Sequence, residues 1–241
     1  MIIPDVAVHK QEIEENGYSA VPGVFTAETV KSIADGIAMV DRSNRNFRQS
    51  EALFAIRQLF KEVPGVIPLI FTKAFIDVVT NLLGNNYFVV KSIYFDKPEQ
   101  SNWFVAYHQD LTISVDKRTD IEGFGPWTAK QDQFAVQPPL DYLENIVTIR
   151  IHLDDTDEGN GALKVIPGSH KKGIYRPETI DWNTESEAIC AVPAGGIMVM
   201  KPLLLHASGR STNQKRRRVI HIEFSNKGLP AELQWSEKQL F

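Results

Sequence analysis

The sequence has only one cysteine, Cys190, among its 241 residues. A single thiol excludes an intramolecular disulfide framework, and it also excludes a metal site built from several cysteines. Proteins that depend on disulfides belong to oxidising compartments, so this scarcity is typical of a protein in a reducing one. We therefore expect a cytoplasmic protein.

The sequence also lacks a long apolar run and an excess of positive charge. No apolar run approaches the roughly 18 residues that a membrane-spanning helix needs, and the first residues have no basic segment followed by an apolar stretch, as a signal peptide would. Lys and Arg number 26 against 30 Asp and Glu, which gives a net charge of −4. This balance argues against a surface for nucleic acid or anionic membrane. We expect neither among the partners.

The chain does contain enough apolar residues to build a core. Hydrophobic residues make up 43% and charged residues 23%, which is typical of a folded protein. The length suits a single domain over residues 1–241. Residues 1–86 predict a mainly helical flank, with a helix over 27–37 capped by Thr26, a second over 50–60, and a third over 68–83 that Gly84 ends.

From residue 87 the hydrophobic period changes to two, which predicts strands. In the clearest of them, over 146–154, apolar residues alternate with Thr148, Arg150 and His152. Helices followed by many strands indicate an α+β fold with a mostly β core over residues 87–228, either a sandwich or an open barrel. The polar stretch over about 112–139 is long for a loop, and we expect it to be a lid. The other expected strands cover residues 87–95, 103–108, 163–166, 197–200, 203–206 and 217–224.

Two histidines and one aspartate form a candidate metal site. His108 and Asp110 are two residues apart at the end of a predicted strand, so their side chains project to the same face. His206 ends a predicted apolar strand near the other end of the chain. Two histidines and a carboxylate on a β scaffold form the facial triad of non-haem Fe(II) oxygenases. The alternatives are a hydrogen-bonded surface pair for His108 and Asp110, and a core histidine for His206.

An arginine near the third ligand suggests an organic acid as co-substrate. A facial triad leaves three coordination positions open, and an α-keto acid can fill two of them. Its distal carboxylate then needs a fixed cation, for which the planar guanidinium of Arg217 is suited. Strand alternation places Arg217 on one face and its neighbours Arg216 and Arg218 on the other. The alternative for this run of basic residues is a solvated surface.

These motifs together resemble the phytanoyl-CoA dioxygenase family of Fe(II)/2-oxoglutarate oxygenases. The family pattern has a His-x-Asp, a distal His, a Ser two residues later and an Arg eleven residues after that His. Here these are His108, Asp110, His206, Ser208 and Arg217. Residues 153–170 and 17–25 are similar to two further signatures of the family, so the likeness spans nearly the whole chain.

The resemblance implies a fold, a cofactor and a reaction. The fold would be a double-stranded β-helix (jelly-roll, cupin-like) with flanking N-terminal helices. Iron(II) would be held by the triad, and 2-oxoglutarate would be bound by Arg217 and Ser208, with Trp127 and Lys91 as further contacts. Dioxygen would complete the site, and a carboxylate at position 110 favours hydroxylation.

The substrate implied is a small molecule: an amino acid, an acyl thioester or a natural-product intermediate. Arg150 and His152 are candidate substrate-binding residues, because they share the polar face of their predicted strand. The sequence does not define an oligomeric state. Two other functions stay open, namely a cupin-like metal-binding module without turnover and a metal-dependent isomerase.

Overall fold

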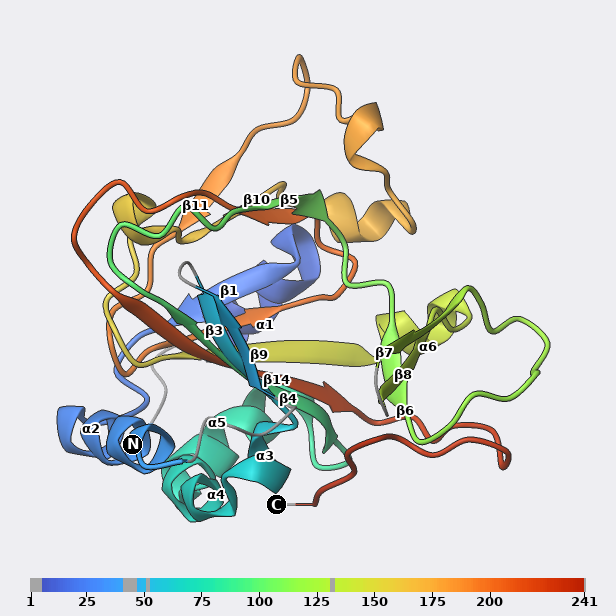
Figure 1. Cartoon of the computed structure of the whole chain (residues 1–241). Coiled ribbons are helices and arrows are strands. Elements are labelled where there is room, and N and C mark those ends of the chain that lie inside the picture. The colour runs from blue at the N-terminus through green and yellow to red at the C-terminus, as the bar shows by residue number, and fades with distance from the viewer. Residues whose placement is uncertain (1–5, 41–46, 51–52, 131–132, 241) are drawn as a thin grey trace.

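The structure is a computed structural model, and it describes residues 6–40, 47–50, 53–130 and 133–240 (Figure 1). Its helices are α1 (Val6–Asn16), α2 (Ala27–Ala38), α3 (Leu59–Glu62), α4 (Ile67–Ile70), α5 (Lys73–Leu83) and α6 (Leu140–Glu144). Its strands are β1 (Tyr18–Val21), β2 (Phe47–Ser50), β3 (Leu53–Arg57), β4 (Phe88–Lys97), β5 (Val105–His108), β6 (Ile113–Val115), β7 (Trp127–Lys130), β8 (Gln133–Val136), β9 (Ile146–His152), β10 (Leu163–Val165), β11 (Ala188–Cys190), β12 (Ile197–Met200), β13 (His206–Ser208) and β14 (Arg217–Ser225).

Two antiparallel sheets face each other and form the β core (Figure 1). The larger has seven strands in the order β1-β12-β9-β14-β4-β3-β2, and the smaller has four in the order β11-β10-β13-β5. The predicted α+β fold with a double-stranded β-helix core is therefore confirmed. Helices α2 to α5 gather on the outer side of the large sheet, at the lower left of Figure 1.

The two faces of the large sheet differ in chemistry. In β9, Val147, Ile149 and Ile151 belong to a hydrophobic core that also contains buried residues of α2 and α5. The alternate residues Arg150 and His152 are buried as well, but they lie on the opposite face, toward the smaller sheet. This inner face of β9 is thus polar, as the alternation in the sequence predicts, and it lies beside an apolar cluster that includes Leu163, Met198 and Met200.

The predicted helix over residues 50–60 is wrong. Residues 53–57 form β3, which pairs with β4 in the register Phe54 opposite Asp96 and Ile56 opposite Tyr94, and helical structure begins only at α3. A short apolar run is compatible with a helix or a buried strand, and the pairing with β4 decides between them. Part of the predicted range, residues 51–52, lies outside the described residues.

The structure also contains helices where the other two are predicted. The helix over 27–37 is confirmed as α2, and the Thr26 hydroxyl accepts a hydrogen bond from the backbone N–H of Thr29. The stretch over 68–83 is divided into α4 and α5, because Thr72 caps a new helix. Within the described residues, no single helix is long and apolar enough for a membrane span; only the bent pair 64–70 and 73–83 meets both conditions together.

The segment predicted to be a lid contains a third sheet, with its strands in the order β6-β8-β7 (right side of Figure 1). Ile113, Val115 and Val136 are buried within it, and Val115 bridges to Trp235 near the C-terminus. The segment therefore forms a sheet that packs into a core shared with β4, β9 and the C-terminal residues, instead of the loop structure expected. Its role as a lid stays a prediction.

Candidate metal centre

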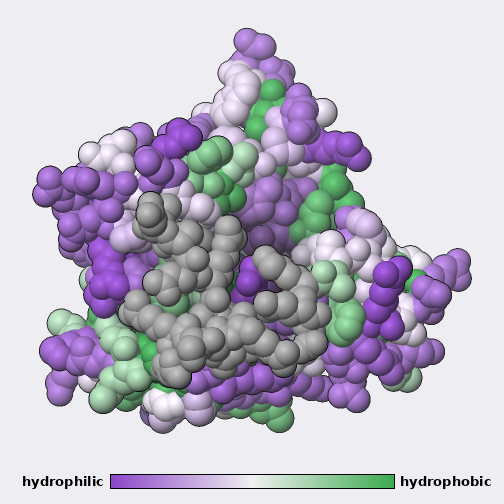
Figure 2. All heavy atoms as spheres, viewed as in Figure 1, coloured by the Kyte–Doolittle hydropathy of each residue, from purple (hydrophilic) through white to green (hydrophobic). Residues whose placement is uncertain are grey.

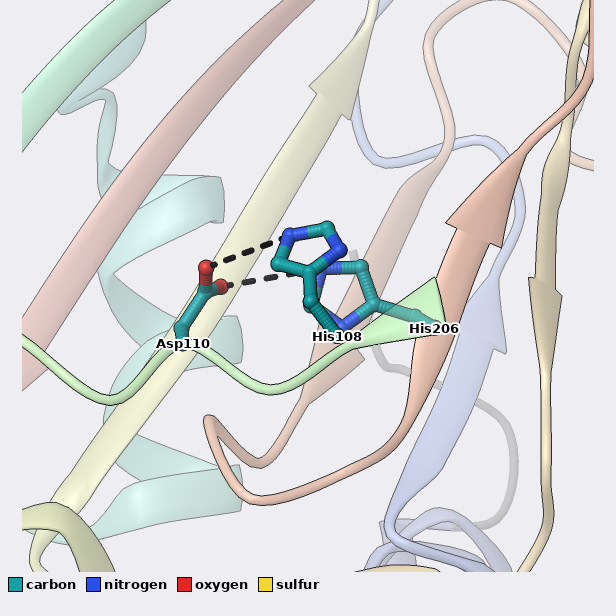
Figure 3. A group of neighbouring side chains, drawn as sticks. All are labelled: His108, Asp110 and His206. Atoms are coloured by element: carbon teal, nitrogen blue, oxygen red, sulfur yellow. Dashed lines mark ion pairs between the residues drawn. The ribbon is translucent and has the colours of Figure 1, made fainter. Parts of the chain in front are cut away.

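His108, Asp110 and His206 converge inside the β-helix (Figure 3). The two histidines lie directly opposite each other on β5 and β13, and their ring centroids are 4.2 Å apart. The sequence predicts a strand that ends at His206, whereas β13 begins there. The leucines before it lie in and after a turn that is closed by a hydrogen bond from the Leu204 N–H to the Lys201 carbonyl. The three residues that the sequence predicts as ligands are thus brought together.

Backbone contacts orient both imidazoles in the same way. The Nδ1 of His108 lies 2.9 Å from the Ala106 carbonyl, and the Nδ1 of His206 lies 2.9 Å from the Leu204 carbonyl. Since a carbonyl can only accept, each Nδ1 carries the proton and each Nε2 has a free lone pair. Both Nε2 atoms lie 3.8 Å from the Asp110 carboxylate, one from each oxygen. Oxygen Oδ2 of Asp110 is buried and has no hydrogen-bond partner.

Gln109 anchors the segment between two ligands. Its amide nitrogen donates to the carbonyls of Gly173 and Leu203, and its carbonyl oxygen accepts from the backbone N–H of Tyr175. These contacts hold Gln109 away from the cavity, and its neighbours His108 and Asp110 consequently face the cavity. Without such anchoring, a short loop after a strand would not fix the position of a ligand.

The protonation states of the ligands suit a divalent metal. Burial would raise the pKa of Asp110, but the neighbouring basic groups of His206, His221 and Lys91 outweigh burial and lower this pKa. Burial lowers the pKa of His206 to about 4. A carboxylate and a neutral imidazole are the forms that bind metal. The donor set and its open side therefore fit iron(II) held by a facial triad.

In a second cluster beside this site, the histidine has no free nitrogen for a metal. Asp110, His221 and Glu223 lie close enough to share an ion. However, Nη1 of Arg150 lies 3.2 Å from Nδ1 of His221, and Nε2 of His221 lies 3.2 Å from Glu223. A guanidinium can only donate, so Nδ1 of His221 is the acceptor and Nε2 carries the proton. The cluster is a hydrogen-bonded network that supports the site.

A cavity of about 240 Å³ connects the ligands to the predicted arginine anchor. Arg217 lines it and is only 3% exposed. Its Nη1 donates to the Gly161 carbonyl and lies 3.3 Å from the Ser208 hydroxyl, while its Nε has no partner. The cavity is lined by Phe95, Trp103, Val105, His108, Asp110, Arg150, Leu163, His206, Ala207, Ser208, Arg217 and His221.

The neighbours of Arg217 point outward, as strand alternation predicts. Arg216 pairs with Asp96 through two nitrogens, and Arg218 pairs with Asp154 in the same way. Arg217 faces the interior, where burial and the charge of Arg150 lower its pKa to about 9. A buried cation that is held this way favours an anionic ligand.

Lys97 is a buried cation that the sequence interpretation missed. It lies directly opposite Arg217 in the pairing of β4 with β14, and its ammonium group donates to the Gly209 carbonyl. Burial, followed by the charge of Arg217, lowers its pKa to about 8. Its position two residues beyond Phe95 on an alternating strand is the only signal that could have indicated it.

Of the other residues predicted for the site, some line the metal cavity and some do not. Arg150 lines the cavity. His152 is buried, with Nδ1 2.7 Å from the Thr156 hydroxyl and Nε2 without a partner. Lys91 forms an ion pair with Glu223 at 2.8 Å and lines a neighbouring cavity of about 260 Å³. Trp127 packs with the core of the third sheet and does not line the metal cavity, where Trp103 lies instead.

The sequence and the fold both match known proteins. The sequence model of the phytanoyl-CoA dioxygenase family (PhyH) matches residues 13–219. A probable alpha-ketoglutarate-dependent hypophosphite dioxygenase of Stutzerimonas stutzeri is 24% identical over 250 residues, which cover 91% of this chain and 78% of the relative.

Two crystal structures share the fold at low sequence identity. EctD from S. alaskensis with bound Fe gives a TM-score of 0.69 at 17% identity, covering 91% of this chain and 76% of that one. The epimerase SnoN, in complex with Fe3+, alpha ketoglutarate and nogalamycin RO, gives 0.67 at 15%, covering 91% and 83%.

Proposed function

Because the chain belongs to the phytanoyl-CoA dioxygenase family of Fe(II)- and 2-oxoglutarate-dependent oxygenases, we propose that it hydroxylates a small-molecule substrate. In this reaction one oxygen atom of O2 enters the substrate as a hydroxyl group. The other enters succinate, and C1 of 2-oxoglutarate leaves as CO2. Bound iron supplies the redox chemistry and the open coordination positions.

The protein itself supplies the ligands and the orientation. His108, Asp110 and His206 would hold the iron. Arg217, with the Ser208 hydroxyl beside it, would bind the distal carboxylate of 2-oxoglutarate, because a guanidinium pairs with a carboxylate through two parallel hydrogen bonds. Arg217 and Ser208 are each 3% exposed, and burial of this kind strengthens an electrostatic contact.

One observation carries this proposal. Two imidazole Nε2 atoms are directed at one carboxylate, and a buried arginine with an unpartnered Nε lines the same cavity. A metal-binding module without turnover needs the first feature but has no use for the second. A metal-dependent isomerase that works without 2-oxoglutarate would also need no such anchor.

The test is turnover by the purified protein with Fe(II), ascorbate, 2-oxoglutarate and O2. We expect slow succinate release without substrate and faster release with the right one, and none from His206→Ala. Metal binding without any succinate would support a binding module instead. The screen should include amino acids, acyl thioesters and, because the Stutzerimonas relative is named for it, hypophosphite.

The mass of the product distinguishes hydroxylation from other outcomes. Hydroxylation adds one oxygen atom, whereas desaturation or ring closure removes two hydrogens and epimerisation leaves the mass unchanged. The comparison is needed because one structural neighbour, SnoN, is an epimerase. An unchanged or reduced mass would contradict the hydroxylation proposed here.

A further inference from the structure

The metal cavity keeps a net positive charge even when iron(II) and 2-oxoglutarate are both bound. Among the described residues that line it, Asp110 is the single acid, against the guanidiniums of Arg150 and Arg217. Iron(II) brings two further positive charges and 2-oxoglutarate two negative ones. The loaded cavity therefore keeps a net positive charge before the ammonium group of Lys97 is considered.

Arg150 is the cation with no assigned counter-ion. It is 7% exposed, and it lies in the middle of the large sheet, directly opposite His221 on β14 and Met198 on β12. The carboxylate that stabilises its charged form is Asp110. In the loaded protein that carboxylate binds the metal, and the distal carboxylate of 2-oxoglutarate is held by Arg217.

The residues around Arg150 hold its guanidinium in place but do not accept hydrogen bonds from all of its nitrogens. Its Nη1 donates to His221, His221 donates to Glu223, and Glu223 accepts from Lys91. This chain of contacts uses one nitrogen of the guanidinium. Nε is buried and has no hydrogen-bond partner, which is costly unless a ligand provides an acceptor.

We propose that Arg150 binds an anionic oxygen group of the substrate, so that the enzyme oxidises small carboxylates or phosphorus oxyanions. The inference rests on the proposed function and deepens it. The shared chemistry of the two classes is an oxyanion that accepts hydrogen bonds from a guanidinium. The cavity is small, which favours a substrate whose anionic group lies within a few bonds of the atom that is oxidised.

The experiment measures binding apart from turnover. Protein loaded with Zn(II) and saturated with 2-oxoglutarate is titrated calorimetrically with L-proline, other small carboxylates, hypophosphite and methylphosphonate. The amide of each carboxylate, which lacks the carboxylate charge, serves as its matched control. We expect at least one of the carboxylates or phosphorus oxyanions to bind the wild-type protein, and for a carboxylate we expect its amide to bind at least about tenfold more weakly. If no anion binds, or the amides bind equally well, the proposal is wrong.

Variants separate this role from co-substrate binding. Arg150→Gln should lose at least about tenfold in affinity for the anion and should keep its affinity for 2-oxoglutarate. Arg150→Lys, which retains the charge, should lose less. Equal loss of both affinities in Arg150→Gln would make Arg150 a second co-substrate anchor and overturn the proposal. If the wild-type protein fails to bind 2-oxoglutarate at all, it is the proposed function that fails.

Discussion

Replacing Arg217 provides a sensitive test of how this site binds its co-substrate. Arg217→Ala removes the guanidinium, and Arg217→Lys keeps the charge but cannot pair with a carboxylate through two parallel bonds. In the structure this guanidinium is 3% exposed, it lines the metal cavity, and its Nε is unpartnered. It is therefore arranged to bind an external anion.

The expected loss follows from these features. Truncating one partner of a buried, hydrogen-bonded charge pair costs about 2–5 kcal/mol, which is roughly 30- to several-thousand-fold in affinity. We expect Arg217→Ala to fall within this range for 2-oxoglutarate and Arg217→Lys to fall at its lower end. Because burial lowers the pKa of Arg217 to about 9, its charge is unfavourable in the empty site. Arg217→Ala should therefore unfold at no lower denaturant concentration than the wild type.

Calorimetric titration of the Zn(II)-loaded proteins with 2-oxoglutarate measures this loss directly. Arg216→Ala and Arg218→Ala are matched controls on either side of Arg217, and their side chains face outward and pair with Asp96 and Asp154, respectively. Neither Arg216 nor Arg218 lines the metal cavity, so these variants should keep co-substrate affinity within about twofold. A large effect at Arg216 or Arg218, or none at Arg217, would refute the assignment.

Three further predictions concern the rest of the site. His108→Ala, Asp110→Ala and His206→Ala should each lose most of their iron but keep the wild-type circular dichroism spectrum, because each removes one of three ligands; iron content near the wild-type value would remove that residue from the ligand set. The pKa of Lys97 is lowered to about 8 in the folded protein. Between about pH 8 and its ordinary pKa of 10.5 only the unfolded state therefore holds this proton, so the free energy of unfolding should rise with pH in this range. Urea denaturation without 2-oxoglutarate should show a smaller rise for Lys97→Met than for the wild type. An equal rise in the two proteins would contradict this reasoning. Gly161 has a φ of +83°, and a Cβ there would lie 2.9 Å from the Gly209 carbonyl, so Gly161→Ala should lower both stability and 2-oxoglutarate affinity; unchanged values would show that the Gly161 carbonyl does not position Arg217.

Alternation along single strands made much of the site predictable. The parity of β9 places Arg150 and His152 inside the β-helix, and the parity of β14 separates Arg217 from Arg216 and Arg218. Both depend on the period of two, which is a local property of an extended chain. The candidate metal ligands were predictable because their spacing matches a family pattern that covers nearly the whole chain.

Features that depend on contacts between distant strands were not predictable. The sequence predicts a helix over residues 50–60, where β3 lies, because the pairing of β3 with β4 is not visible in the local sequence. Lys97 faces Arg217 only through the register of β4 with β14, and His221 reaches Arg150 through that of β14 with β9. The tryptophan in the cavity is Trp103, whereas the family resemblance implies Trp127. Loops of variable length lie between such residues and the candidate ligands, so the position of the tryptophan is not fixed by its distance along the sequence.

Turnover under ¹⁸O2 tests the central claim most directly. With Fe(II), 2-oxoglutarate and a substrate found by the screen, we expect one labelled oxygen atom in succinate and one in the product, with succinate and product formed in equal amounts. The same reaction with His206→Ala should yield neither. Product that forms without succinate, or succinate that carries no label, would contradict an oxygenase that uses 2-oxoglutarate at this site.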